Sequence, residues 1–101
     1  MANNLSYNPL RVDTAATAIS SAEGVDVLAM QWLDDDGAAG GVIGDGEDLD
    51  MVINGVLVHI NVLDASAVGP MAWSVEFSRP FKIYSLVVSA IAGGTLIIWK
   101  A

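Results

Sequence analysis

The dipeptide Asn54-Gly55 lies between two apolar runs, residues 49–53 and 56–63, and it restricts the possible folds of this chain more than any other feature. A type I′ turn needs positive φ at both central positions, and Asn and Gly tolerate positive φ better than other residues. The sequence therefore predicts a two-residue β-hairpin at this position, and antiparallel β-structure is the starting point for the rest of the chain.

Short apolar segments separated by turn residues recur along the sequence, and none shows a sustained helical period. The dipeptide Gly93-Gly94 predicts a second hairpin, in which residues 95–100 return antiparallel to residues 81–91. Residues 14–23, which are rich in Ala, Ser and Thr, are expected to form an irregular loop or a weak helical turn. The predicted strands, in chain order, are residues 10–12, 25–33, 42–43, 49–53, 56–63, 72–77, 81–91 and 95–100.

Seven or eight short strands at spacings near ten residues are typical of a β-sandwich or barrel rather than of alternating β/α units. The predicted fold class is therefore all-β, an antiparallel β-sandwich that is jelly-roll-like or Ig-like. A length of 101 residues fits one domain, residues 1–101. Its first part, about residues 1–13, is expected to be an extended arm that leads into a short edge strand.

Composition and charge restrict the possible partners. The hydrophobic fraction is 53%, against about 45–50% in ordinary globular chains. Such an excess favours an oligomer interface, docking on a larger assembly, or a membrane. The net charge is −8, with only four basic residues, and nucleic-acid binding needs clustered Lys and Arg. The composition therefore argues against nucleic acid as a partner, and the lack of cysteine excludes disulfides and thiolate metal sites.

The uncharged run of residues 83–99 raises the alternative of a small membrane-anchored protein. A membrane-spanning helix needs about 20 mainly apolar residues. This run is slightly shorter, it contains Gly93-Gly94, and it is rich in β-branched residues. A hairpin therefore explains the run better than a membrane span, and no membrane partner is predicted.

The sequence predicts no enzyme and no catalytic residues. The only histidine is His59, which shares a predicted strand face with Leu57 and Asn61, and a packed or surface role is expected for it. A nucleophile motif such as G-x-S-x-G is absent. Paired carboxylates could suggest a glycosidase, but a chain of this size with most of its acids in one segment offers little room for a substrate cleft.

Seven of the twelve acidic residues lie between positions 34 and 50, among several glycines. The favoured interpretation is a solvated loop that keeps an apolar protein soluble and blunts a sheet edge, with no cofactor. The alternative is a small ion-binding or carbohydrate-binding β module, because clustered carboxylates can bind Ca²⁺. The spacing does not fit an EF-hand. The candidate calcium ligands are Asp34, Asp36, Asp45, Asp48 and Asp50.

The aromatic and apolar residues suggest where partners bind. Trp32 and Trp73 lie in alternating strands and are expected to pack in the core or on the sheet. Trp99 must dock on its own sheet or on a neighbour. The last two predicted strands are apolar on both faces, which indicates that another subunit covers the second face. The candidate interface residues are Tyr84, Leu86, Val88, Ile97 and Trp99.

Three stretches, residues 7–15 (YNPLRVDTA), 25–32 (VDVLAMQW) and 86–99 (LVVSAIAGGTLIIW), together make the chain resemble the small β-sandwich virion proteins of tailed bacteriophages. The acidic segment 34–50 departs from the family pattern. The resemblance implies a capsid decoration or cement protein, which binds the major capsid protein on the outer surface and stabilises the shell. It also implies a homo-oligomer, with a trimer slightly favoured, located in virions assembled in the host cytoplasm. The alternative within this class is a tail or head-fibre component.

Overall fold

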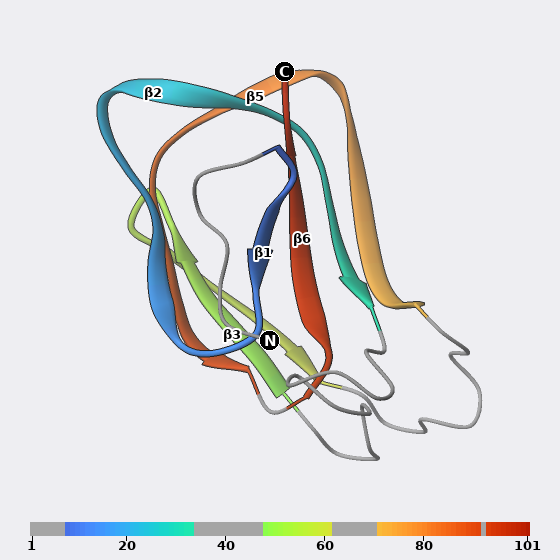
Figure 1. Ribbon diagram of the computed structural model, residues 1–101. Helices are drawn as coiled ribbons and strands as arrows, with labels where there is room; N and C mark the ends of the chain where they lie inside the picture. Colours follow the sequence, from blue (N-terminus) through green and yellow to red (C-terminus); the bar gives the residue numbers. More distant parts are fainter. Residues whose placement is uncertain (1–7, 34–47, 62–70, 92) are drawn as a thin grey trace.

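In the computed structural model, the described residues are 8–33, 48–61, 71–91 and 93–101. These residues form six β-strands and no helix (Figure 1). The strands are β1 (Leu10–Val12), β2 (Ala16–Leu33), β3 (Asp48–Ile53), β4 (Val56–Asn61), β5 (Met71–Ile91) and β6 (Thr95–Lys100). The predicted strand at 42–43 lies outside the described residues.

All six strands belong to one antiparallel sheet, in the order β1-β6-β2-β5-β3-β4. The prediction of an all-β, antiparallel fold is confirmed. The structure describes six strands and not seven or eight because β5, at 21 residues, spans the two predicted strands 72–77 and 81–91, and because 42–43 lies outside the described residues. The strand β2 is also longer than expected, at 18 residues. The predicted edge strand at 10–12 is β1, and it lies at one end of the sheet.

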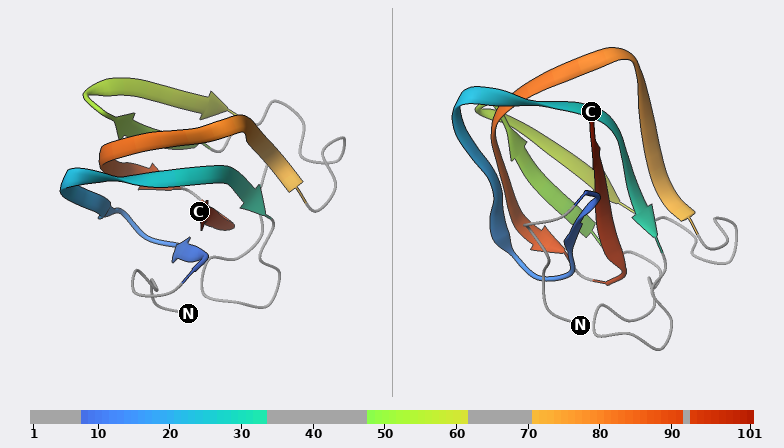
Figure 2. Two further views of the ribbon diagram at one scale, coloured as in Figure 1. Left: turned by 90° about the horizontal axis from the view of Figure 1, so that it is seen from above. Right: turned by 45° about the horizontal axis from the view of Figure 1, so that its top comes forward.

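The two long strands bend together, and this bend folds the sheet over its own core. Ala16 pairs with Val88 at one end of the β2–β5 ladder, and Leu33 pairs with Met71 at the other. Figures 1 and 2 show β2 and β5 turning sharply while they remain side by side. The second half of β2 also pairs with β6, and strands on both sides of the bend contribute side chains to one hydrophobic cluster.

The prediction of a loop or helical turn over residues 14–23 is wrong, because β2 begins at Ala16. Tertiary pairing overrides the weak local preference: Thr17 lies opposite Val87, and Ile19 is buried in the core. The irregular part is short. The ladder shifts register between Ser20 and Val25, where the positive φ of 86° at Gly24 lets the chain loop outwards.

The prediction of two separate strands at 72–77 and 81–91 is also wrong, because β5 continues through Arg79-Pro80. Phe81 lies opposite Val27, whereas Glu76 lies opposite Ala29, so residues 77–80 leave the ladder as a bulge where β5 bends. Proline lacks an N–H donor and is tolerated at such a bulge. The rings of Phe77 and Phe81, at the two ends of the bulge, are 5.1 Å apart between centroids.

Residues 95–100 do not return along β5 as predicted. The chain does turn at Gly94, where φ is 70°, but β6 then pairs with β2 and β1, and β2 lies between β6 and β5. Residues 95–98 are all buried. The two-sided apolarity of this strand is therefore explained by burial within its own chain.

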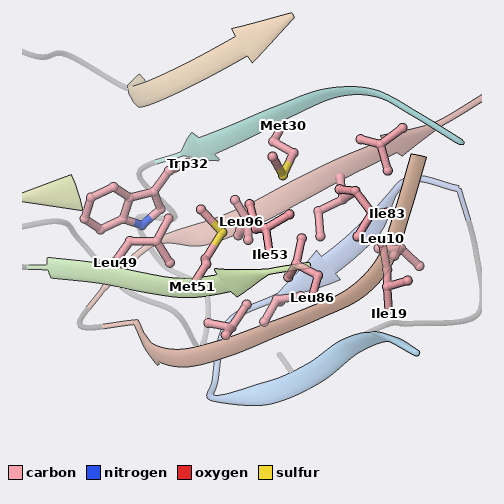
Figure 3. Close-up of a cluster of buried hydrophobic side chains, with 14 residues drawn as sticks. Leu10, Ile19, Met30, Trp32, Leu49, Met51, Ile53, Ile83, Leu86 and Leu96 are labelled. Atoms are coloured by element: carbon pink, nitrogen blue, oxygen red, sulfur yellow. The ribbon is translucent and has the colours of Figure 1, made fainter. Parts of the chain in front are cut away.

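The core contains side chains from both halves of the folded sheet (Figure 3). Trp32 and Leu49 lie at one end of the cluster, and Leu10 and Ile19 lie at the other. The indole Nε1 of Trp32 donates a hydrogen bond to the carbonyl oxygen of Gly93 over 2.7 Å. The predicted core or sheet-packing role of Trp32 is confirmed, and Trp73 packs against the cluster from β5.

Candidate interaction surface

The Asn54-Gly55 turn joins β3 to β4 as predicted, with φ values of 50° and 83°. Its tip is fixed to β5 by the Asn54 side chain. The Oδ1 atom of Asn54 accepts hydrogen bonds from the backbone N–H groups of Tyr84 (2.8 Å) and Ser85 (3.2 Å). Its Nδ2 atom donates to the carbonyl oxygen of Lys82 over 3.1 Å. Asn54 therefore serves both the turn and the attachment of the hairpin to β5.

An apolar hollow of about 370 Å³ opens beside this turn, between the β3–β4 hairpin and the first half of β5. Among the described residues that line it, only Asn54 is polar. The residues that line it come from β3 and β4 on one side and from β2 and the first half of β5 on the other. The apolar lining includes Met30 from β2, Val56 and Val58 from β4, and Trp73, Phe77 and Phe81 from β5.

The strand β4, which forms one wall of the hollow, is the most exposed apolar part of the described chain. Val56 is 64% exposed and Leu57 is 67% exposed. Val56 lines the hollow, whereas Leu57 lies on the opposite face of the strand. The sequence signal for this surface is three successive apolar residues, 56–58, directly after the turn. Apolar residues on both faces, the pattern predicted for the last two strands, are therefore also present in β4.

The other face of the hairpin carries a polar cluster around His59. Its Nδ1 atom contacts Asp50 Oδ1, and its Nε2 atom is 3.7 Å from Asp48 Oδ1. Asn61 Nδ2 donates a hydrogen bond to the same Asp48 carboxylate. His59 is exposed on the face that also carries Leu57, so of the two expected positions, packed or at the surface, the structure has the second.

The candidate calcium ligands are divided between described and undescribed parts of the chain. Asp48 and Asp50 contact His59, while Asp34, Asp36 and Asp45 lie outside the described residues. Within the described ranges, no group of three or more His, Cys, Asp or Glu side chains is arranged to hold a metal ion.

The predicted interface residues separate into two groups. Tyr84 is 48% exposed and Trp99 is 41% exposed. Trp99 docks on its own sheet, because its Nε1 donates to Gln31 Oε1 over 3.0 Å. The other three, Leu86, Val88 and Ile97, are 5% exposed or less, so they belong to the interior of this chain and cannot reach a partner in this fold.

The hollow can accommodate apolar side chains, and the described residues that line it include no acid, base or nucleophile. Among the described residues there is also no helix long and apolar enough to cross a membrane. No protein-family model matches the chain, and neither do curated protein sequences or solved structures.

Proposed function

We propose that this chain is a non-enzymatic structural protein of a phage virion, and specifically a capsid decoration or cement protein. It would bind the major capsid protein on the outer surface of the shell as a homo-oligomer. The observation that carries this proposal is the apolar hollow beside β4, with Val56 at its rim and Leu57 exposed on the opposite face of the strand. An exposed apolar surface of this kind on a small protein suits a permanent protein contact.

The charge of the chain supports an outward position. A net charge of −8 would be unfavourable beside packaged DNA, whose phosphates would repel it. On the outside of a shell the same charge keeps an apolar protein soluble before it docks. A tail or head-fibre location would satisfy the same argument, so the location within the virion must be measured.

We further propose that the folded sheet is a jelly-roll-like β-sandwich. One layer would contain β1, β6, the second half of β2 and the first half of β5. The other would contain the first half of β2, the second half of β5, β3 and β4. Support comes from the pairings on each side of the bend and from the hydrophobic cluster between these halves.

The test is mass spectrometry of purified virions from the phage whose genome encodes the chain, followed by binding of the recombinant protein to virions that lack it. The chain is expected in the virion at high copy number. A Val56→Asp variant is expected to lose binding, since it places a carboxylate at the rim of the hollow. The matched control is Thr17→Asp, at an exposed position on β2. Absence from virions, or unchanged binding of Val56→Asp, would contradict the proposal.

A further inference from the structure

We propose that β4 pairs with β4 of a second copy of this chain, antiparallel and about a two-fold axis that passes through Val58. The inference does not depend on the virion role. It specifies a dimer in place of the trimer that the family resemblance favours. The starting point is that β4 ends the sheet, and no described strand pairs with its outer edge.

Within the described part of the chain, the edge of β4 lacks the features that normally protect an open sheet edge. Proteins block such edges with short strands, charged residues, proline or bulges. β1, at the other end of the sheet, has only three residues and contains Arg11. The first half of β2 has no described strand on its second edge, and it is broken by the register shift between Ser20 and Val25. The first half of β5 also has no described strand on its second edge, and it carries Glu76. β4 has none of these devices: its sequence is VLVHIN, and its register with β3 is unbroken over six pairs.

The backbone of β4 offers hydrogen bonds in the direction of a partner. In a two-residue hairpin, the residues that flank the turn bond to each other, so Val56, Val58 and Ile60 direct their N–H and C=O groups towards β3. Leu57 and His59 direct theirs to the open edge. A two-fold axis at Val58 places Leu57 opposite His59 of the second copy, and this pairing satisfies the N–H and C=O groups of both residues in each copy.

The side chains of β4 are also complementary to themselves in this register. A two-fold axis perpendicular to the sheet leaves each face of the sheet on the same side in both copies. An even-numbered residue of one copy must therefore lie opposite an even-numbered residue of the other, and an odd-numbered residue opposite an odd-numbered one. With the axis at Val58, Val58 meets Val58 of the second copy, and Val56 meets Ile60. These are β-branched pairs, which stabilise antiparallel sheets. They lie on the side of the hollow, and Val56 and Val58 line it, so pairing extends the apolar surface across the two copies.

The negative charge of the chain does not oppose this contact. β4 carries no carboxylate, and the nearest described acids on this sheet, Asp48 and Asp50 on β3, already contact His59. The two β3 strands of a dimer would lie three strand spacings apart, about 14 Å. That separation exceeds the Debye length of about 8 Å at physiological salt, so repulsion between the acids is largely screened.

The first test is the solution mass by light scattering after size exclusion, at protein concentrations up to about 1 mM because a contact of this size is small. A dimer of 21.0 kDa is expected, which is twice the chain mass of 10.5 kDa. A His59→Pro variant removes an N–H that points to the open edge and not to β3. Its dimer dissociation constant is expected to rise at least about tenfold, with an unchanged β-sheet circular dichroism spectrum.

Disulfide cross-linking supplies a test that does not depend on that variant. The chain has no cysteine, so a single introduced cysteine can form a disulfide only between copies. In the proposed register Val58→Cys faces itself and is expected to cross-link. Val56→Cys, at 64% exposure the more accessible position, faces Ile60 and is expected to cross-link several-fold more slowly. Equal or faster cross-linking of Val56→Cys would overturn the register, and a monomer or a trimer in solution would overturn the dimer.

Discussion

The side chain of Asn54 gives the most detailed prediction, because its two roles can be removed separately. It occupies a position with positive φ in the turn, and it makes three hydrogen bonds to the backbone of β5. Asn54→Gly keeps the backbone conformation accessible and removes all three bonds. Asn54→Asp keeps the acceptor oxygen for Tyr84 and Ser85 and removes only the donor to Lys82. Asn54→Ala removes the bonds and adds strain.

The magnitudes follow from the structure. A hydrogen bond contributes about 0.5–1.5 kcal/mol to stability, and Asn54 is exposed, so the low end applies. Asn54→Gly should therefore destabilise the fold by about 1.5 kcal/mol. Asn54→Asp should lose about 0.5 kcal/mol. Asn54→Ala should lose about 1–2 kcal/mol more than Asn54→Gly, because a residue with a Cβ is unfavourable at positive φ.

Thermal unfolding followed by far-ultraviolet circular dichroism measures this series. For a chain of about 100 residues, each kcal/mol lowers Tm by about 4–8 °C, so Asn54→Gly should lower it by roughly 6–12 °C. Amide exchange of Tyr84 and Ser85 should accelerate in the Gly and Ala variants but not in Asn54→Asp. The control is Leu57→Ala, which changes an exposed neighbour of the turn and should have an effect within about 0.5 kcal/mol. Equal stability of Asn54→Gly and the parent chain would refute the role of the side-chain bonds.

Two further pairs of substitutions test the core and the bend. Trp32→Phe leaves the buried Gly93 carbonyl without its donor and should lower the free energy of unfolding by about 2–4 kcal/mol. Trp99→Phe removes a hydrogen bond at an exposed site and should lower it by less than about 1 kcal/mol. Urea unfolding measures both variants, and equal losses would contradict the assigned burial. Gly24→Ala should be more destabilising than Gly55→Ala, because both positions have positive φ but only the added Cβ at Gly24 meets another side chain, at 2.5 Å. A lower midpoint for Gly55→Ala in the same titration would contradict that geometry.

The parts of the fold that sequence could predict depend on local interactions. The Asn54-Gly55 turn was predictable because its φ requirement is met by two adjacent residues, and the all-β class followed from the apolar pattern. The bend could not be predicted in the same way. Residues 25–33 have the pattern of one alternating strand, in which Val27 would lie on the face opposite to Met30 and Trp32. In the structure all three side chains are buried. The register shift between Val27 and Ala29 changes the face that points to the core, from odd-numbered residues before the shift to even-numbered residues after it. Only the pairing with β5 and β6 determines where that shift occurs.

The position of β6 explains why the interface prediction was only partly successful. An apolar strand after a glycine turn is expected to pair with the strand before it, since that closes the shortest loop. Here β6 pairs with β2 and β1 along its two edges, and the burial of its first four residues stabilises this arrangement inside the chain. Apolarity on both faces is therefore an ambiguous signal, because it describes a central strand as well as an interface. For β4 the interface explanation applies, because β4 ends the sheet and Val56 and Leu57 stay exposed on its two faces. The most exposed apolar side chains therefore lie on the β3–β4 hairpin and not on the C-terminal strand. We expect a partner to bind at this hairpin.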